Sequence, residues 1–184
     1  HTRSIMVTGV QTCALPILLA RITPATELTQ LADAQLVIEA ASERLEIKQA
    51  LFSQLAEICS PSTLLTSNTS SISITAIAAG VKHPERVAGL HFFNPAPVMK
   101  LVEVVSGLAT STEVVEQLCQ CVSAWGKQPV RCRSTPGFIV NRVARPYYAE
   151  AWRALEEQVA SAEVIDAALR EGGGFPMGPL TLTD

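Results

Sequence analysis

Short apolar runs alternate with amphipathic segments along most of the chain. Five runs rich in aliphatic and β-branched residues have the length of buried strands, and they cover residues 35–39, 63–66, 86–93, 101–105 and 129–132. Between them, apolar residues recur every three or four positions over 47–58 and 115–125, which predicts two helices. A polar turn over 67–73 leads into a third, shorter helix that ends at Gly80.

The ends of the two longer predicted helices carry start and stop signals. Ser42 suits the N-cap of the first helix, and Pro61 follows its end. For the second helix, Thr110 with Glu113 three residues later predicts a capping box, and Gly126 predicts its end. A helix therefore follows the first and fourth predicted strands, which is typical of an α/β domain.

The pattern changes after the run STPG at 134–137, whose residues break regular structure. One long helical pattern, interrupted by Pro146, covers 138–157, a second covers 162–170, and a loop rich in Gly and Pro follows. We therefore divide the chain into a leader of non-native origin at 1–18, a partial α/β domain at 19–134 and the beginning of a helical domain at 135–184. Two helices and a loop cannot enclose a core, so we expect the helical domain to be truncated.

Composition narrows the functional classes. Fourteen Lys and Arg against 17 Asp and Glu give a net charge of −3, which excludes a general nucleic-acid-binding surface. The richest apolar run, at 13–20, is far shorter than the roughly 18 residues that cross a membrane. The five cysteines have no CxxC spacing, so we expect no metal site and free thiols in the reducing cytoplasm.

Five motifs carry a specific resemblance when they are taken together in this order. They are LVIEA (36–40), SNTSS (67–71), AGLHFFNPAPVMKLVEVV (88–105), TPGFIVNR (135–142) and GGGFPMGPLTLTD (172–184). With these motifs the chain resembles the 3-hydroxyacyl-CoA dehydrogenase family from about residue 21 to its end. The resemblance implies a Rossmann-type NAD-binding domain, then a helical domain through which the full-length parent forms a homodimer. It also implies oxidation of the 3-hydroxyl of an acyl-CoA substrate to a ketone, with NAD accepting hydride.

His91 and Glu103 are the candidate catalytic pair. Oxidation of an alcohol needs a base for the hydroxyl proton, and imidazole titrates near neutral pH. If the strands on either side pair around a turn near Pro97, the two side chains lie opposite each other. The carboxylate would then fix the imidazole tautomer. Taken singly, each residue has an ordinary alternative: a satisfied histidine at a strand end, and a carboxylate on a wet sheet face.

Ser70 and Asn141 correspond to the family positions that hydrogen-bond the reacting oxygens of the substrate. Ser70 lies in a loop that follows a predicted strand, where open α/β sheets place their ligands. Its alternative is a helix N-cap, for which other serines of the same loop compete. Asn141 lies between apolar residues of a predicted helix, and its alternative is a structural hydrogen bond between domains.

The resemblance also implies that Glu43, Lys48, Ser70 and Asn94 contact the cofactor. From the residues alone, Glu43 in the first helical turn favours the helix N-terminus electrostatically, and Lys48 is a solvated helix charge. The family's glycine-rich turn is missing, because only Gly9 follows the first apolar residues. We therefore expect this chain to bind NAD poorly and to turn over slowly.

Two other functions stay open from the sequence. One is a non-catalytic, crystallin-like member of the same family, against which the His91 and Glu103 pair argues. The other is a hydroxyacid dehydrogenase of a related fold, which would use a lysine as its catalytic group.

Overall fold

The computed structural model describes residues 19–183. Residues 1–18, interpreted above as a leader, lie outside the described residues, and so does Gly9. No helix in the described part is long and apolar enough to cross a membrane.

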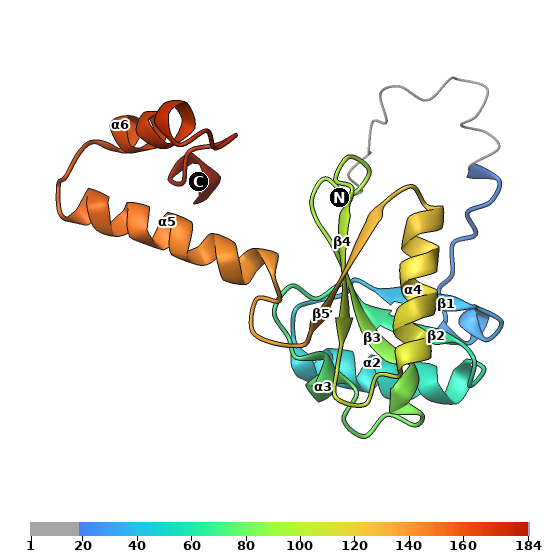
Figure 1. Cartoon of the computed structure of the whole chain (residues 1–184). Helices are drawn as coiled ribbons and strands as arrows, with labels where there is room; N and C mark the ends of the chain where they lie inside the picture. Colours follow the sequence, from blue (N-terminus) through green and yellow to red (C-terminus); the bar gives the residue numbers. More distant parts are fainter. Residues whose placement is uncertain (1–18, 184) are drawn as a thin grey trace.

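A five-stranded sheet forms the centre of the molecule (Figure 1). Its strands lie in chain order: β1 (Leu36–Glu39), β2 (Leu64–Ser67), β3 (Val87–Phe92), β4 (Leu101–Ser106) and β5 (Gln128–Arg133). The first three are parallel, β4 is antiparallel to β3, and β5 is parallel to β4. All five predicted strands are therefore confirmed, and so is the pairing of β3 and β4 around the turn between them.

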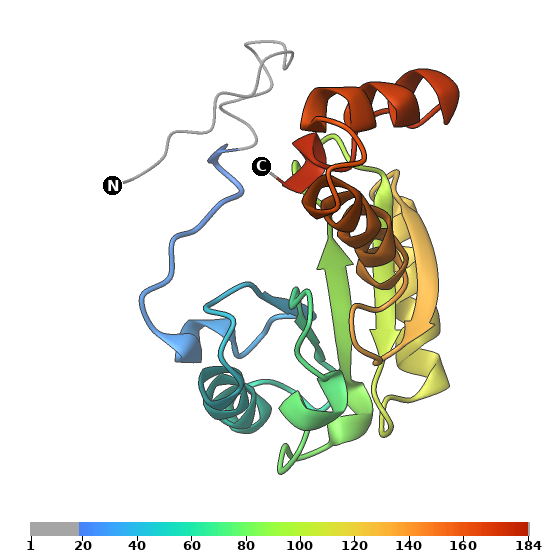
Figure 2. The same ribbon diagram turned by 90° about the vertical axis from the view of Figure 1, so that its left-hand side faces the viewer.

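Helices cover both faces of this sheet (Figures 1 and 2). The helices α2 (Leu45–Ile58) and α3 (Ile74–Ile77) pack on one face, and α4 (Thr112–Ala124) packs on the other. Short 3-10 turns, η1 (Leu28–Leu31) and η2 (Pro84–Arg86), precede β1 and β3.

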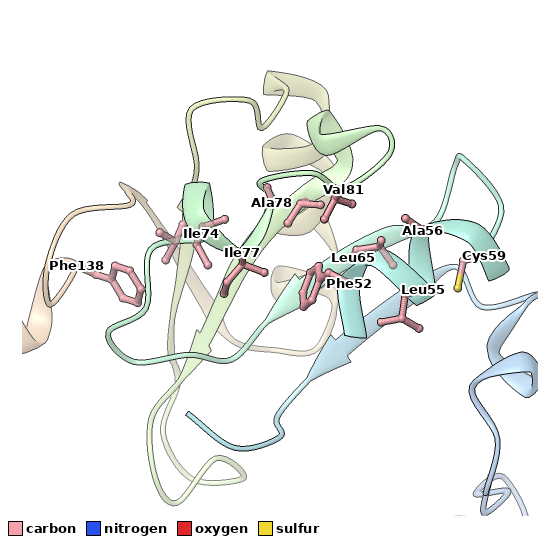
Figure 3. Close-up of a cluster of buried hydrophobic side chains, with 12 residues drawn as sticks. Phe52, Leu55, Ala56, Cys59, Leu65, Ile74, Ile77, Ala78, Val81 and Phe138 are labelled. Carbon is pink, nitrogen blue, oxygen red and sulfur yellow. The ribbon is translucent and has the colours of Figure 1, made fainter. Parts of the chain in front are cut away.

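The alternation of side chains along each strand produces two cores. In β3, Val87 joins the cluster under α2 and α3, whereas Ala88 and Leu90 join the cluster under α4. Figure 3 shows the first cluster, in which Phe52 and Leu65 pack beside α3. Because His91 follows Leu90, the same alternation places its side chain on the face of α2 and α3.

Two predicted helix caps were wrong. The helix α2 begins three residues after Ser42, at Leu45, and its N-cap Arg44 makes no side-chain capping bond. At α4 the cap is Ser111, whose hydroxyl accepts the N–H of Val114. The Thr110 hydroxyl instead donates to the Val87 carbonyl, because that strand end offers an acceptor at 2.6 Å.

Beyond β5 the chain is helical, as predicted, and this segment projects away from the sheet (Figure 1). It contains α5 (Val140–Glu156), α6 (Ala162–Ala167), a π-helical turn η3 (Ala168–Gly172) and a 3-10 turn η4 (Thr181–Thr183). The predicted interruption at Pro146 was wrong, because α5 continues through it. The proline removes one N–H donor, and contacts such as the bond from the Tyr147 hydroxyl to the Met177 carbonyl help to hold the helix beyond it.

Candidate active site

His91 and Glu103 form a buried pair across β3 and β4. They are direct partners in the antiparallel register, and Nδ1 of His91 lies 2.7 Å from Oε2 of Glu103. Their exposures are 4% and 0%, so the alternative of a carboxylate on a wet sheet face was wrong. An ionised carboxylate only accepts hydrogen bonds, so Nδ1 carries the proton and Nε2 keeps its lone pair. That nitrogen can take up a proton from a substrate.

The second oxygen of Glu103 binds the start of α5. Oε1 accepts the backbone N–H groups of Ile139 and Val140, each at 2.9 Å. These N–H groups have no partner within the helix, and a carboxylate there also interacts favourably with the helix dipole. Glu103 therefore joins the imidazole to the first residues of the C-terminal helical segment.

Two phenylalanines surround the imidazole on the other sides. The ring centroid of Phe93 lies 4.6 Å and that of Phe138 5.6 Å from the His91 ring. Phe138 is 3% exposed and has a backbone φ of 48°, in the left-handed region. These two apolar rings pack against the imidazole and shield it from water.

Asn141 and Ser70 approach each other at the same end of the sheet. Nδ2 of Asn141, in the first turn of α5, lies 3.5 Å from the carbonyl oxygen of Ser70, at the limit of a hydrogen bond. Ser70 itself is exposed, and the N-cap of α3 is Ser73, so the capping alternative for Ser70 was wrong.

The residues expected at the cofactor fall into two groups. Glu43 and Asn94 are exposed at the edge where β1, β2 and β3 end, together with Ser70. Lys48 is 1% exposed, so its description as a solvated helix charge was wrong, since it is paired with two carboxylates. Glu43 also lies before α2 rather than in its first turn.

Glu43 organises the loop that carries Ser70. Its Oε1 accepts the Thr69 hydroxyl at 2.5 Å, the Ser70 N–H at 3.1 Å and the Ser71 hydroxyl at 3.2 Å. Partial burial raises the pKa of Glu43, but these bonds and the charge of Lys48 outweigh it and hold the pKa below the ordinary value. The carboxylate is therefore ionised at neutral pH.

Sequence reasoning missed Glu39, which lies at the end of β1 and is 6% exposed. Its carboxylate accepts both Lys48 and the Ser67 hydroxyl, and so connects the ends of β1 and β2. The available signal was a charged residue closing an apolar strand, which must find partners if it is buried.

Comparison with known proteins gives a consistent result. Two family models match: the 3-hydroxyacyl-CoA dehydrogenase NAD binding domain over residues 8–135, and the C-terminal domain of the same family over 137–184. The chain is 80% identical over 166 residues to 3-hydroxyadipyl-CoA dehydrogenase of Escherichia coli K12, which covers 90% of this chain and 35% of that protein. It is 50% identical over 149 residues to mitochondrial hydroxyacyl-coenzyme A dehydrogenase of Homo sapiens, covering 81% of this chain and 48% of that one.

A solved structure agrees with these matches. The crystal structure of 3-hydroxybutyryl-CoA dehydrogenase from Escherichia coli K12 superposes with a TM-score of 0.93 and 74% identity, over 96% of this chain and 37% of that chain. The chain thus spans between about a third and a half of the length of these relatives.

Proposed function

The chain belongs to the 3-hydroxyacyl-CoA dehydrogenase family, and from this premise we propose that it carries the reacting residues of an NAD-dependent oxidation of 3-hydroxyacyl-CoA to 3-ketoacyl-CoA. The observation that carries the proposal is the buried contact of 2.7 Å between His91 and Glu103 at the ligand-binding edge of an α/β sheet.

In the proposed reaction, Nε2 of His91 takes the proton of the substrate 3-hydroxyl. Glu103 stabilises the imidazolium that forms, because its negative charge lies against Nδ1. The Asn141 amide and the Ser70 hydroxyl hydrogen-bond the reacting oxygens, and the contact between the two residues supports a shared pocket. NAD, when it is bound, accepts the hydride from C3, the carbon that carries this hydroxyl.

The exposed polar groups fit the nicotinamide end of such a cofactor. Glu43 supplies an ionised acceptor for hydroxyl groups, while Ser70 and Asn94 supply neutral donors and acceptors at the same edge of the sheet. Lys48 belongs to this site behind Glu43, since their charged atoms are 3.4 Å apart.

The test uses this chain extended at both ends with the corresponding residues of a longer relative, referred to below as the completed enzyme. We expect NADH oxidation that depends on acetoacetyl-CoA, and His91→Ala to lower kcat by about 10²–10⁴-fold. The matched control is His83→Ala, which removes an exposed histidine paired with Glu85 and should leave kcat unchanged. Equal activity of His91→Ala and the parent would refute the proposed role. We expect the 184-residue chain alone to react more slowly.

A second assay separates the remaining alternatives. A crystallin-like protein would give no turnover with any acyl-CoA even when completed, and a hydroxyacid dehydrogenase would prefer free hydroxyacids to their CoA esters. We expect preference for the CoA esters, measured as kcat/KM across a substrate panel.

We also propose a cytoplasmic location and a homodimeric full-length parent. The four cysteines in the described part, which are all free thiols, support a reducing compartment. Exposed apolar side chains on the C-terminal helices, among them Val143 and Trp152, support association through this segment. Cell fractionation and light scattering of the full-length protein test the two statements.

A further inference from the structure

Lys48 is almost completely buried beside two carboxylates in this structure. Its side chain is 1% exposed, and Nζ lies 2.8 Å from both carboxylate oxygens of Glu39 and 3.4 Å from Oε2 of Glu43. An ammonium group has three N–H donors, and three carboxylate oxygens surround this one.

Each carboxylate around Lys48 holds a different part of the neighbouring backbone. Glu39 accepts the Ala41 N–H and the Ser67 hydroxyl, each at 2.6 Å, and so fixes the end of β2. Through its second oxygen, Glu43 accepts three donors of the loop at 69–71, including the Ser70 N–H. The charge of Lys48 is thus linked to both ends of the segment that presents Ser70.

The two carboxylates need Lys48 in order to stay close together. Without it, two negative charges would share a partly buried site, which favours protonating one of them or moving it into water. Glu43 is the one free to move, since its side chain is 43% exposed and that of Glu39 only 4%. Its departure would leave the Ser70 N–H without its acceptor.

We propose that Lys48 is a positioning residue, which holds Glu43 against the loop at 67–71 and thereby sets the place of Ser70. This inference rests on the proposed function only for the role of Ser70. The alternative is that Lys48 acts only through direct contact with the cofactor and leaves the loop unchanged.

Amide hydrogen exchange of the peptide covering 67–73 tests the inference on the chain as it is. We expect Lys48→Met to speed exchange at Ser70 and Ser71 by about tenfold or more, the loss expected when a hydrogen bond to a charged group is removed. The control is Lys82→Met, since that lysine is 61% exposed and paired only with Glu57. Its exchange over 67–73 should match the parent chain.

A second variant covers the case in which Lys48→Met fails to fold. Glu43→Ala keeps the pair between Lys48 and Glu39, and it should open the loop at 67–71 by a similar factor. Exchange within about twofold of the parent in either folded variant overturns the inference.

Fluorescence titration with NADH completes the test. Weaker binding in Lys48→Met with an unchanged loop means direct contact and overturns the inference. Weaker binding together with a faster-exchanging loop supports it. If the parent chain binds no NADH, the proposed cofactor site fails for this chain, and the exchange data still decide the role of Lys48.

Discussion

Two different substitutions of Glu103 should separate its role in stability from its role in proton transfer. The side chain is 0% exposed and accepts three hydrogen bonds: Nδ1 of His91 at 2.7 Å, and the N–H groups of Ile139 and Val140 at 2.9 Å each. Glu103→Ala removes the acceptor of all three donors at once. Glu103→Gln keeps the shape and one carbonyl oxygen.

The magnitude for Glu103→Ala follows from these contacts. Each buried donor left without a partner costs about 1–3 kcal/mol, and Glu103→Ala leaves three such donors. We expect a loss of about 3 kcal/mol or more in the free energy of unfolding, a large share of the roughly 5–15 kcal/mol of an ordinary domain. The matched control is Glu116→Ala, which breaks an exposed pair with Arg131 and should leave stability near that of the parent chain.

Glu103→Gln should instead change the tautomer of His91. The two N–H groups of α5 can only donate, so they select the oxygen of the introduced amide and direct its NH₂ group toward Nδ1. That ring nitrogen must then accept, and the ring proton moves to Nε2. Nε2 can no longer take a proton from an alcohol, so kcat should fall by about 10²–10⁴-fold in a completed enzyme.

Two measurements check this reasoning on the chain itself. Urea unfolding followed by tryptophan fluorescence gives the stability difference, and ¹⁵N chemical shifts of the His91 ring report which nitrogen is protonated. A Glu103→Ala chain as stable as Glu116→Ala, or an unchanged His91 tautomer in Glu103→Gln, would contradict the geometry of the pair.

Three further predictions concern packing and pH. Gly89→Ala should cost about 1–3 kcal/mol in urea unfolding, because a Cβ there would lie 2.8 Å from Cβ of Val105. Leu118→Ala should cost about 2–5 kcal/mol, since Leu118 is 0% exposed, whereas Leu108→Ala, at 92% exposure, should cost almost nothing. Hydrogen bonds from a threonine hydroxyl and two backbone N–H groups hold the pKa of Asp166 below its ordinary value. Its contribution to stability is therefore complete above the unfolded pKa and is lost as the pH falls through the lowered folded pKa, and Asp166→Asn should remove this acid dependence from thermal melts.

The strands were predictable because burial leaves a continuous apolar run in the sequence. The helix caps were not, because neighbouring hydroxyl residues such as Thr110 and Ser111 carry the same propensity. Only the position of the Val87 carbonyl decides which of the two hydroxyls caps α4, and that carbonyl lies 23 residues away along the chain.

The contacts of the candidate site were also predictable only in part. The contact between His91 and Glu103 was predictable, since the position of a hairpin turn fixes which residues face each other. The burial of Lys48 was not, because its partner Glu39 lies nine residues earlier in a strand, outside the helical spacing by which charges on one helix pair.

Buried Glu103 needs more hydrogen-bond donors than the sequence alone identifies. A fully buried carboxylate needs several donors, and one imidazole supplies a single N–H. The others come from residues 36 and 37 positions further along, where the run at 134–137 was interpreted only as a boundary. Gly137 adopts a φ of 75°, and a Cβ there would lie 3.0 Å from the Arg142 N, so glycine is what lets the chain turn into α5 at this point. The turn that ends the sheet thus brings two N–H donors to the carboxylate, so Gly137→Ala should lower the free energy of urea unfolding without touching either member of the pair.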